Sequence, residues 1–140
     1  MTIAGLNHVL QMKFSYTILP ERRLNILRFK GSVSVLDVTS SIEQFWADER
    51  HNPEYNGIVC LEGVTTRAKI EDLKVLLNFL ESQRKSVGWW AAILTEPKAT
   101  ALALIFKAAF QGSVNLEIVS DWEAACRFLQ VDLPDNVAKV

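Results

Sequence analysis

The sequence predicts a single α/β domain with a mixed, mostly parallel sheet and helices, in the order β-β-α-β-α-β-α-β-α. Three observations carry this prediction. Residues 14–19 alternate apolar and polar side chains, which is typical of a half-buried strand. Residues 58–61 and 89–94 are apolar throughout, as strands inside a parallel sheet are. Amphipathic stretches of helical period lie between these strands, so right-handed crossovers should connect them.

The first half of the chain begins with a predicted hairpin and a helix. The strand at 14–19 should pair with a second strand at 24–29, because Pro20 occupies the position where its fixed φ suits a type I turn. Ser34 and Asp37 have the spacing of a capping box. A helix is therefore expected from Ser34 to about Glu49.

The second half alternates helices and strands. An amphipathic helix is predicted at about 68–85, because leucines recur there at spacings of three and four. The next helix should span 97–110, with proline in its first turn. An outer strand follows at 114–119, and Ser120 with Glu123 forms a capping-box pattern for the last helix.

Composition and length set the broad class. The chain has 140 residues, of which 49% are hydrophobic, and a net charge of −1. This length buries a core without a metal or disulfide. The charge balance argues against nucleic-acid binding, and no stretch approaches the roughly 20 apolar residues of a membrane span. We expect an N-terminal arm at 1–13, a domain at 14–133 and a C-terminal tail at 134–140. Without a basic signal-peptide region in residues 1–12, a cytoplasmic location is expected.

Three segments then suggest a family. YTILPERRLNILRFKGSVSVLDV (16–38), GIVCLEGVTT (57–66) and SDWEAACRFLQVD (120–132) resemble the SpoIIAA-like, STAS-type domains of bacteria, above all their small stand-alone members. The resemblance implies a SpoIIAA-like fold and a non-enzymatic, protein-interaction or regulatory role like that of anti-sigma-factor antagonists. Regulatory members carry a phosphorylated serine after the third strand. The corresponding stretch here, residues 62–71, has no serine, so the resemblance assigns the phosphoacceptor role to no residue.

Residues that could carry catalysis are sparse. The two histidines, His8 and His51, lie in no nucleophile motif, and the glycines form no phosphate-binding loop. Cys60 and Cys126 lie inside apolar runs without metal-ligand spacing, so both are expected to be small buried side chains. We predict no catalytic residue, no cofactor and no metal site, and therefore a protein that is not an enzyme.

One polar cluster suggests an anion site. Thr65, Thr66 and Arg67 immediately precede the helix expected at 68–85, and a helix start offers backbone N–H groups to an anion. Ordinary capping of that helix by Thr66 is the alternative explanation.

The helix at 97–110 is too apolar for a surface helix. Its polar residues are Lys98, Thr100 and Lys107 alone. Leu102, Ile105, Phe106 and Ala109 can fill the core face, which leaves a candidate partner or ligand surface of Ala99, Ala103, Leu104 and Phe110. Such patches mark an interface, so a homodimer or a protein partner is expected, unless the arm or the tail covers the helix.

The alternative function is binding of a lipid-like or other apolar small molecule. The pocket would lie between the helix at 97–110 and the sheet. Trp89 and Trp90 are neighbours, so their rings should lie on opposite faces of the sheet. Both are expected in the core, and one of them could line this pocket.

Overall fold

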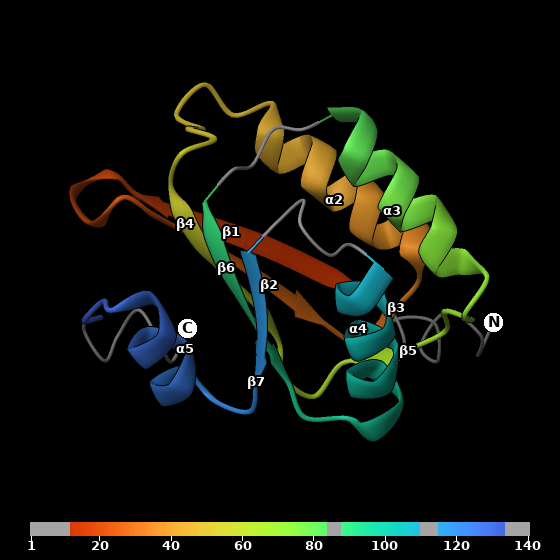
Figure 1. Ribbon diagram of the computed structural model, residues 1–140. Helices are drawn as coiled ribbons and strands as arrows, with labels where there is room; N and C mark the ends of the chain where they lie inside the picture. The colour runs from red at the N-terminus through yellow and green to blue at the C-terminus, as the bar shows by residue number, and fades with distance from the viewer. Residues whose placement is uncertain (1–11, 84–87, 110–114, 134–140) are drawn as a thin grey trace, which may run out of the picture.

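A computed structural model of the chain describes residues 12–83, 88–109 and 115–133 (Figure 1). The predicted tail at 134–140 and residues 1–11 of the predicted arm lie outside the described residues. The last residue of the predicted helix 97–110, Phe110, lies outside them as well.

Five strands form the main sheet, in the order β1-β2-β4-β6-β7. The outer strand β1 is antiparallel to β2, and all other neighbouring strands are parallel. The predicted mixed, mostly parallel α/β domain is therefore confirmed. The strands are β1 (Lys13–Leu19), β2 (Leu24–Lys30), β4 (Asn56–Leu61), β6 (Trp89–Leu94) and β7 (Asn115–Val119).

Helices cover both faces of this sheet unequally. Three of them, α2 (Val35–Trp46), α3 (Asp72–Gln83) and α4 (Pro97–Ala109), lie on one face, while α5 (Trp122–Leu129) lies on the other (Figure 1). The core is divided accordingly. Phe29 and Phe45 belong to the cluster on the three-helix face, whereas Ile26 and Leu129 belong to the cluster under α5.

Two short features were not predicted. The chain forms a second, two-stranded sheet from β3 (Ser32–Val33) and β5 (Thr65–Thr66), which are parallel, with Val33 opposite Thr66. The hairpin turn between β1 and β2 is a short 3₁₀ helix, η1 (Pro20–Arg22), followed by Arg23 in the left-handed conformation. The small sheet joins the start of α2 to the chain that leads into α3.

Side-chain hydrogen bonds set where the helices begin. The capping box of α2 is confirmed, because Ser34 Oγ accepts from the Asp37 N–H at 3.1 Å and Asp37 accepts from the Ser34 N–H at 2.9 Å. For α5 the prediction is wrong: Asp121 is the N-cap, and its carboxylate accepts from the Ala124 N–H at 2.8 Å. An aspartate accepts this bond better than the serine before it, because it is charged.

The start of α3 also differs from the prediction. The helix begins at Asp72, four residues later than expected. Before it, the Ala68 N–H donates to Thr66 Oγ1 and the Lys69 N–H donates to the Asp72 carboxylate. Side-chain acceptors that satisfy backbone N–H groups in this way compete with helix formation.

The two tryptophans of β6 do lie on opposite faces, but only one is in the core. Trp90 is buried on the three-helix face. Trp89 is 51% exposed, with its ring 5.5 Å from that of Phe128 in α5. The prediction of two core rings is wrong for Trp89, because α5 has only eight residues and is too short to cover the whole face.

Candidate ligand-binding cavity

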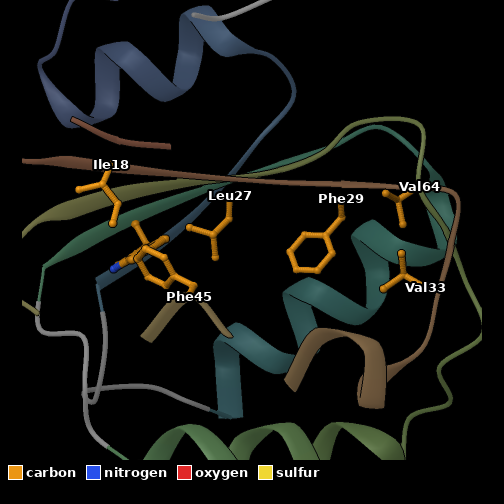
Figure 2. Close-up of a cluster of buried hydrophobic side chains, with 7 residues drawn as sticks. Ile18, Leu27, Phe29, Val33, Phe45 and Val64 are labelled. Atoms are coloured by element: carbon orange, nitrogen blue, oxygen red, sulfur yellow. The ribbon is translucent and has the colours of Figure 1, made fainter. Parts of the chain in front are cut away.

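A cavity of about 260 Å³ lies between the sheet and the three helices on one face. Figure 2 shows Leu27 and Phe29 pointing from β2 into this space, with Val33 and Val64 close together at one end. In the same view α2 and α4 lie next to the sheet, and α3 lies beyond both of them. The sheet is therefore the floor, α2 and α4 are the walls, and α3 is the roof.

The lining comes from every element around the cavity. The floor is made by alternate residues of four strands, because successive side chains in a strand point to opposite faces. These floor residues are Leu27, Phe29, Val59, Leu61, Trp90, Ala92, Leu94, Leu116 and Ile118. The helices contribute residues at spacings of three and four: Val35, Val38, Ile42, Phe45 and Trp46 of α2; Leu73, Leu76 and Leu80 of α3; Ala99, Leu102, Ala103 and Phe106 of α4.

Polar groups are almost absent from this lining. Among the described residues, Ser34 and Thr66 contribute hydroxyl groups beside the small two-stranded sheet, and Trp46 and Trp90 contribute indole N–H groups. The buried Trp90 Nε1 has no hydrogen-bond partner among the described residues. Thr66 Oγ1 accepts from the Ala68 N–H at 3.0 Å and lies 3.5 Å from the Val33 carbonyl oxygen. No titratable side chain lines the cavity, so its described surface offers apolar contacts rather than acid–base or nucleophilic chemistry.

The void follows from the sizes of the side chains that meet above the sheet. The α4 wall contacts the floor through Ala99 and Ala103, which pack against Ala92 and Leu94. Alanine side chains are too short to fill the space under a roof helix that rests on α2 and α4 rather than on the strands. Protein interiors are normally filled, so a void of this size requires an explanation beyond stability.

The face of α4 that points inward differs from the prediction. Ala99 is 8% exposed, and Ala103 lines the cavity, so assigning these two residues to an exposed patch is wrong. Leu104 is 52% exposed, as expected, and Phe110 lies outside the described residues. Ile105, expected in the core, is exposed. The alanine face turns inward because short side chains let α4 approach the sheet most closely.

The candidate anion site has a different setting from the one predicted. Thr65 and Thr66 form β5 instead of a helix start, because α3 begins only at Asp72. The Arg67 guanidinium forms an ion pair with Asp37 of α2 at 2.9 Å and donates to the Ser32 carbonyl oxygen at 3.4 Å. Its charge is thus matched by a carboxylate, and the expected array of helix N–H groups is not beside it.

A second polar cluster lies at the far end of α2. The Tyr16 hydroxyl donates to the Asp48 carboxylate at 2.8 Å, and Arg50 donates two side-chain hydrogen bonds to the same group. The Arg50 bonds, with help from Tyr16, hold the pKa of Asp48 well below its usual range, while the bond to Asp48 raises the pKa of Tyr16. This cluster ties β1 to the end of α2 and lies outside the cavity lining.

The cysteines are less buried than predicted. Cys60 and Cys126 are both only partly buried, and both thiols are free. Burial still raises the pKa of each thiol above its ordinary value, so the reactive thiolate is disfavoured. Cys60 lies on the α5 face of β4 and not in the cavity.

Metal-ligand clusters and membrane-spanning helices are both absent from the described ranges. No group of three or more His, Cys, Asp or Glu residues there is arranged to hold a metal ion. Within the same ranges, no helix is both long and apolar enough to cross a membrane.

Comparison with known proteins found no matching family model and no matching curated protein.

Sequence reasoning found part of the cavity lining and missed the rest. It placed a possible pocket between the helix at 97–110 and the sheet and allowed for one of the two tryptophans, which is Trp90, but it put Ala99 and Ala103 on the outer face of that helix. It did not connect α2 and α3 with a pocket, although both supply lining side chains. Their leucine, valine and phenylalanine pattern is the same whether a helix packs on a filled core or around a void, so no sequence signal separates the two cases.

Proposed function

We propose that this protein binds an apolar small molecule in the cavity between the sheet and helices α2, α3 and α4. The observation that carries the proposal is a cavity of about 260 Å³ whose lining is apolar except for the hydroxyls of Ser34 and Thr66 and the indole N–H groups of Trp46 and Trp90. Cavities lined by apolar side chains stay dry and bind apolar ligands, whereas polar cavities hold water. The resemblance to SpoIIAA-like, STAS-type domains implies a non-enzymatic role, with protein interaction or regulation rather than small-molecule binding as its expected form.

The volume limits the size of the ligand. An engineered protein cavity of about 150 Å³ holds benzene, so by proportion 260 Å³ suits about ten non-hydrogen atoms. A molecule of this size, for example a short alkyl chain or a small alkylbenzene, would contact the floor, both walls and the roof of the cavity. The proposed function is therefore binding of a small hydrocarbon-like molecule, rather than of a full-length membrane lipid.

The test fills the cavity from α4. Ala103 lines the cavity, and leucine at this position adds three carbons that project into the void. We expect Ala103→Leu to raise the free energy of unfolding by about 1 kcal/mol, since it buries apolar surface without displacing other atoms. Isopentylbenzene, a small alkylbenzene of the proposed kind, is the probe ligand. Ala103→Leu should weaken its binding about tenfold or more. Binding is measured by native mass spectrometry and by the fluorescence of Trp46 and Trp90, which line the cavity.

A matched control makes the same substitution where no cavity lies. Ala125 of α5 is fully buried against Leu24 and Ile26 on the other face of the sheet. Ala125→Leu should lower the free energy of unfolding by about 1–3 kcal/mol through overpacking and leave ligand affinity unchanged. If wild-type protein binds no isopentylbenzene and carries no co-purified ligand, the proposed function is wrong.

A second candidate role, self-association, rests on the outer face of α4. Ala101, Leu104, Ile105 and Ala108 are all exposed and recur at spacings of three and four, so they form one apolar stripe along the helix. Small residues beside leucine and isoleucine allow a second helix to approach closely. The proposed partner is a second copy of this chain, with the two α4 stripes packed together about a twofold axis.

This role predicts an effect on oligomeric state. Leu104→Glu places a charge in the stripe and should shift the sedimentation profile from dimer to monomer while the circular dichroism spectrum is unchanged. Val75→Glu is the control, because Val75 is an exposed apolar residue on α3, outside the stripe. Wild-type protein that sediments as a monomer at high micromolar concentration would exclude homodimer formation through α4.

A further inference from the structure

The roof helix α3 is the least buried of the three helices around the cavity. None of its side chains from Asp72 to Ser82 is fully buried, and Val75 is 58% exposed. Its main contacts are with α2 and α4 rather than with the strands. The residues that it turns inward line the cavity: Leu73, Leu76 and Leu80. The face that a helix normally packs on a core is therefore turned toward the cavity.

The other two helices are fixed more firmly. Phe45 of α2 is buried in the core cluster on this face. Ala99 of α4 packs directly on strand residues, and Lys107 of the same helix forms an ion pair with Glu117 of β7 at 2.7 Å. Segments with few buried contacts open at a lower free energy than segments packed in the core. Among the three helices, α3 is the one that can move away with the smallest loss of contacts.

The chain that leads into α3 has the form of a hinge. Ala68 is 7% exposed, and the Arg67 N–H donates to the Val33 carbonyl oxygen at 3.1 Å, so the chain is anchored up to this point. Residues 69–71 are all exposed and connect this anchor to α3. Hinges are short segments of this kind, whose φ and ψ angles absorb the rotation of the element that follows. A rotation about residues 69–71 would lift α3 and leave the sheet unchanged.

A ring contact joins the C-terminal half of α3 to α2. The Phe79 ring stacks on the Trp46 ring, with centroids 5.3 Å apart and an interplanar angle of 12°. Both side chains are only partly buried. Trp46 lines the cavity, whereas Phe79 lies outside the lining. A stacked pair adds a modest stabilisation, so this contact can hold α3 in place and still break within the folded protein.

We propose that α3 is the gate of the cavity: it turns about residues 69–71, breaks the contact between Trp46 and Phe79, and so admits or releases the apolar ligand. This inference rests on the proposed function and adds the route by which the ligand enters. The floor and the two walls keep their positions during opening, because their contacts with each other do not involve α3.

The first measurement needs no ligand. Amide hydrogen exchange of the full chain, followed by nuclear magnetic resonance, reports how readily each helix opens. We expect central amides of α3, in residues 77–82, to exchange about tenfold or more faster than those of α2, in residues 40–45. Equal exchange rates in the two helices would overturn the gate.

The second measurement weakens the ring contact. Phe79→Ala removes it without removing a lining residue. The rate constants for association and dissociation of isopentylbenzene, followed by stopped-flow tryptophan fluorescence, should each rise about tenfold. The Kd should change less than about twofold, because the free and the loaded protein lose the same contact. Phe79→Leu replaces this variant if its circular dichroism spectrum differs from that of the wild type.

Phe128→Ala is the matched control. The Phe128 ring lies 5.5 Å from that of Trp89, so this variant also loses a ring contact made by a helix. Its helix, α5, lies on the other face of the sheet and contributes no residue to the cavity lining. Both rate constants should therefore equal those of the wild type.

The remaining outcomes separate this inference from the proposed function. If isopentylbenzene binds and Phe79→Ala leaves both rate constants unchanged, the gate is wrong and the proposed function stands. If only the dissociation rate constant rises, and the Kd rises with it, Phe79 contributes to binding and the gate is again wrong. If the wild type binds no isopentylbenzene, the proposed function fails, and the gate fails with it even where α3 exchanges quickly.

Discussion

Replacement of Phe45 by alanine is expected to lower the free energy of unfolding by about 3–5 kcal/mol. The Phe45 ring is 1% exposed and meets two rings edge-on, Tyr16 with centroids 5.3 Å apart and His51 at 4.9 Å. It also borders the cavity, so its removal enlarges an existing void instead of allowing neighbours to collapse. A domain of this size has a total stability of about 5–15 kcal/mol, so this one substitution removes a large share of it.

Urea denaturation followed by circular dichroism measures this loss. Phe45→Leu is the control, because leucine keeps most of the apolar contact and should cost about 1–2 kcal/mol. A loss below about 1 kcal/mol for Phe45→Ala would show that the ring is not packed as described.

The second large effect is expected at Gly57. A Cβ atom at this position would overlap the six-membered ring of Trp90, the residue opposite Gly57 in the pairing of β4 with β6. The ring is buried in the core, so Gly57→Ala should cost about 3 kcal/mol through overpacking. Movement of the ring, which lines the cavity, would relieve the overlap and would also change the shape of the cavity.

A double-mutant cycle separates this clash from other effects of the substitution. Without the indole ring, in a Trp90→Val background, Gly57→Ala should cost less than about 1 kcal/mol. Equal costs in the two backgrounds would place the cause elsewhere, for example in the backbone of β4.

The element order was predictable because periodicity is a local property of the chain. The continuous apolar runs of β4 and β6 identify central parallel strands, and the Ser34–Asp37 pair identifies the start of α2. The strands β3 and β5 could not be predicted, since two residues are too few to show a period. Alternation placed Trp89 and Trp90 on opposite faces, but it carries no information on how far α5 extends over its face.

The candidate site was less predictable, because a void is a property of several elements at once. Judged by side-chain size, Leu102, Ile105 and Phe106 of α4 should face the core. The structure turns Ala99, Ala103 and Phe106 inward and Ile105 outward. Whether alanines leave a gap depends on the side chains opposite them. The periodicity of a single helix carries no information about those side chains.

The cavity also makes the protein sensitive to hydrostatic pressure. Apolar side chains disfavour water in the space above the sheet, and unfolding lets water reach them, so the unfolded state occupies less total volume. Compression therefore drives this domain toward unfolding more strongly than it would a completely filled domain of equal length. A bound molecule that occupies the space removes much of that volume difference, so the loaded protein is the less compressible and more pressure-resistant form.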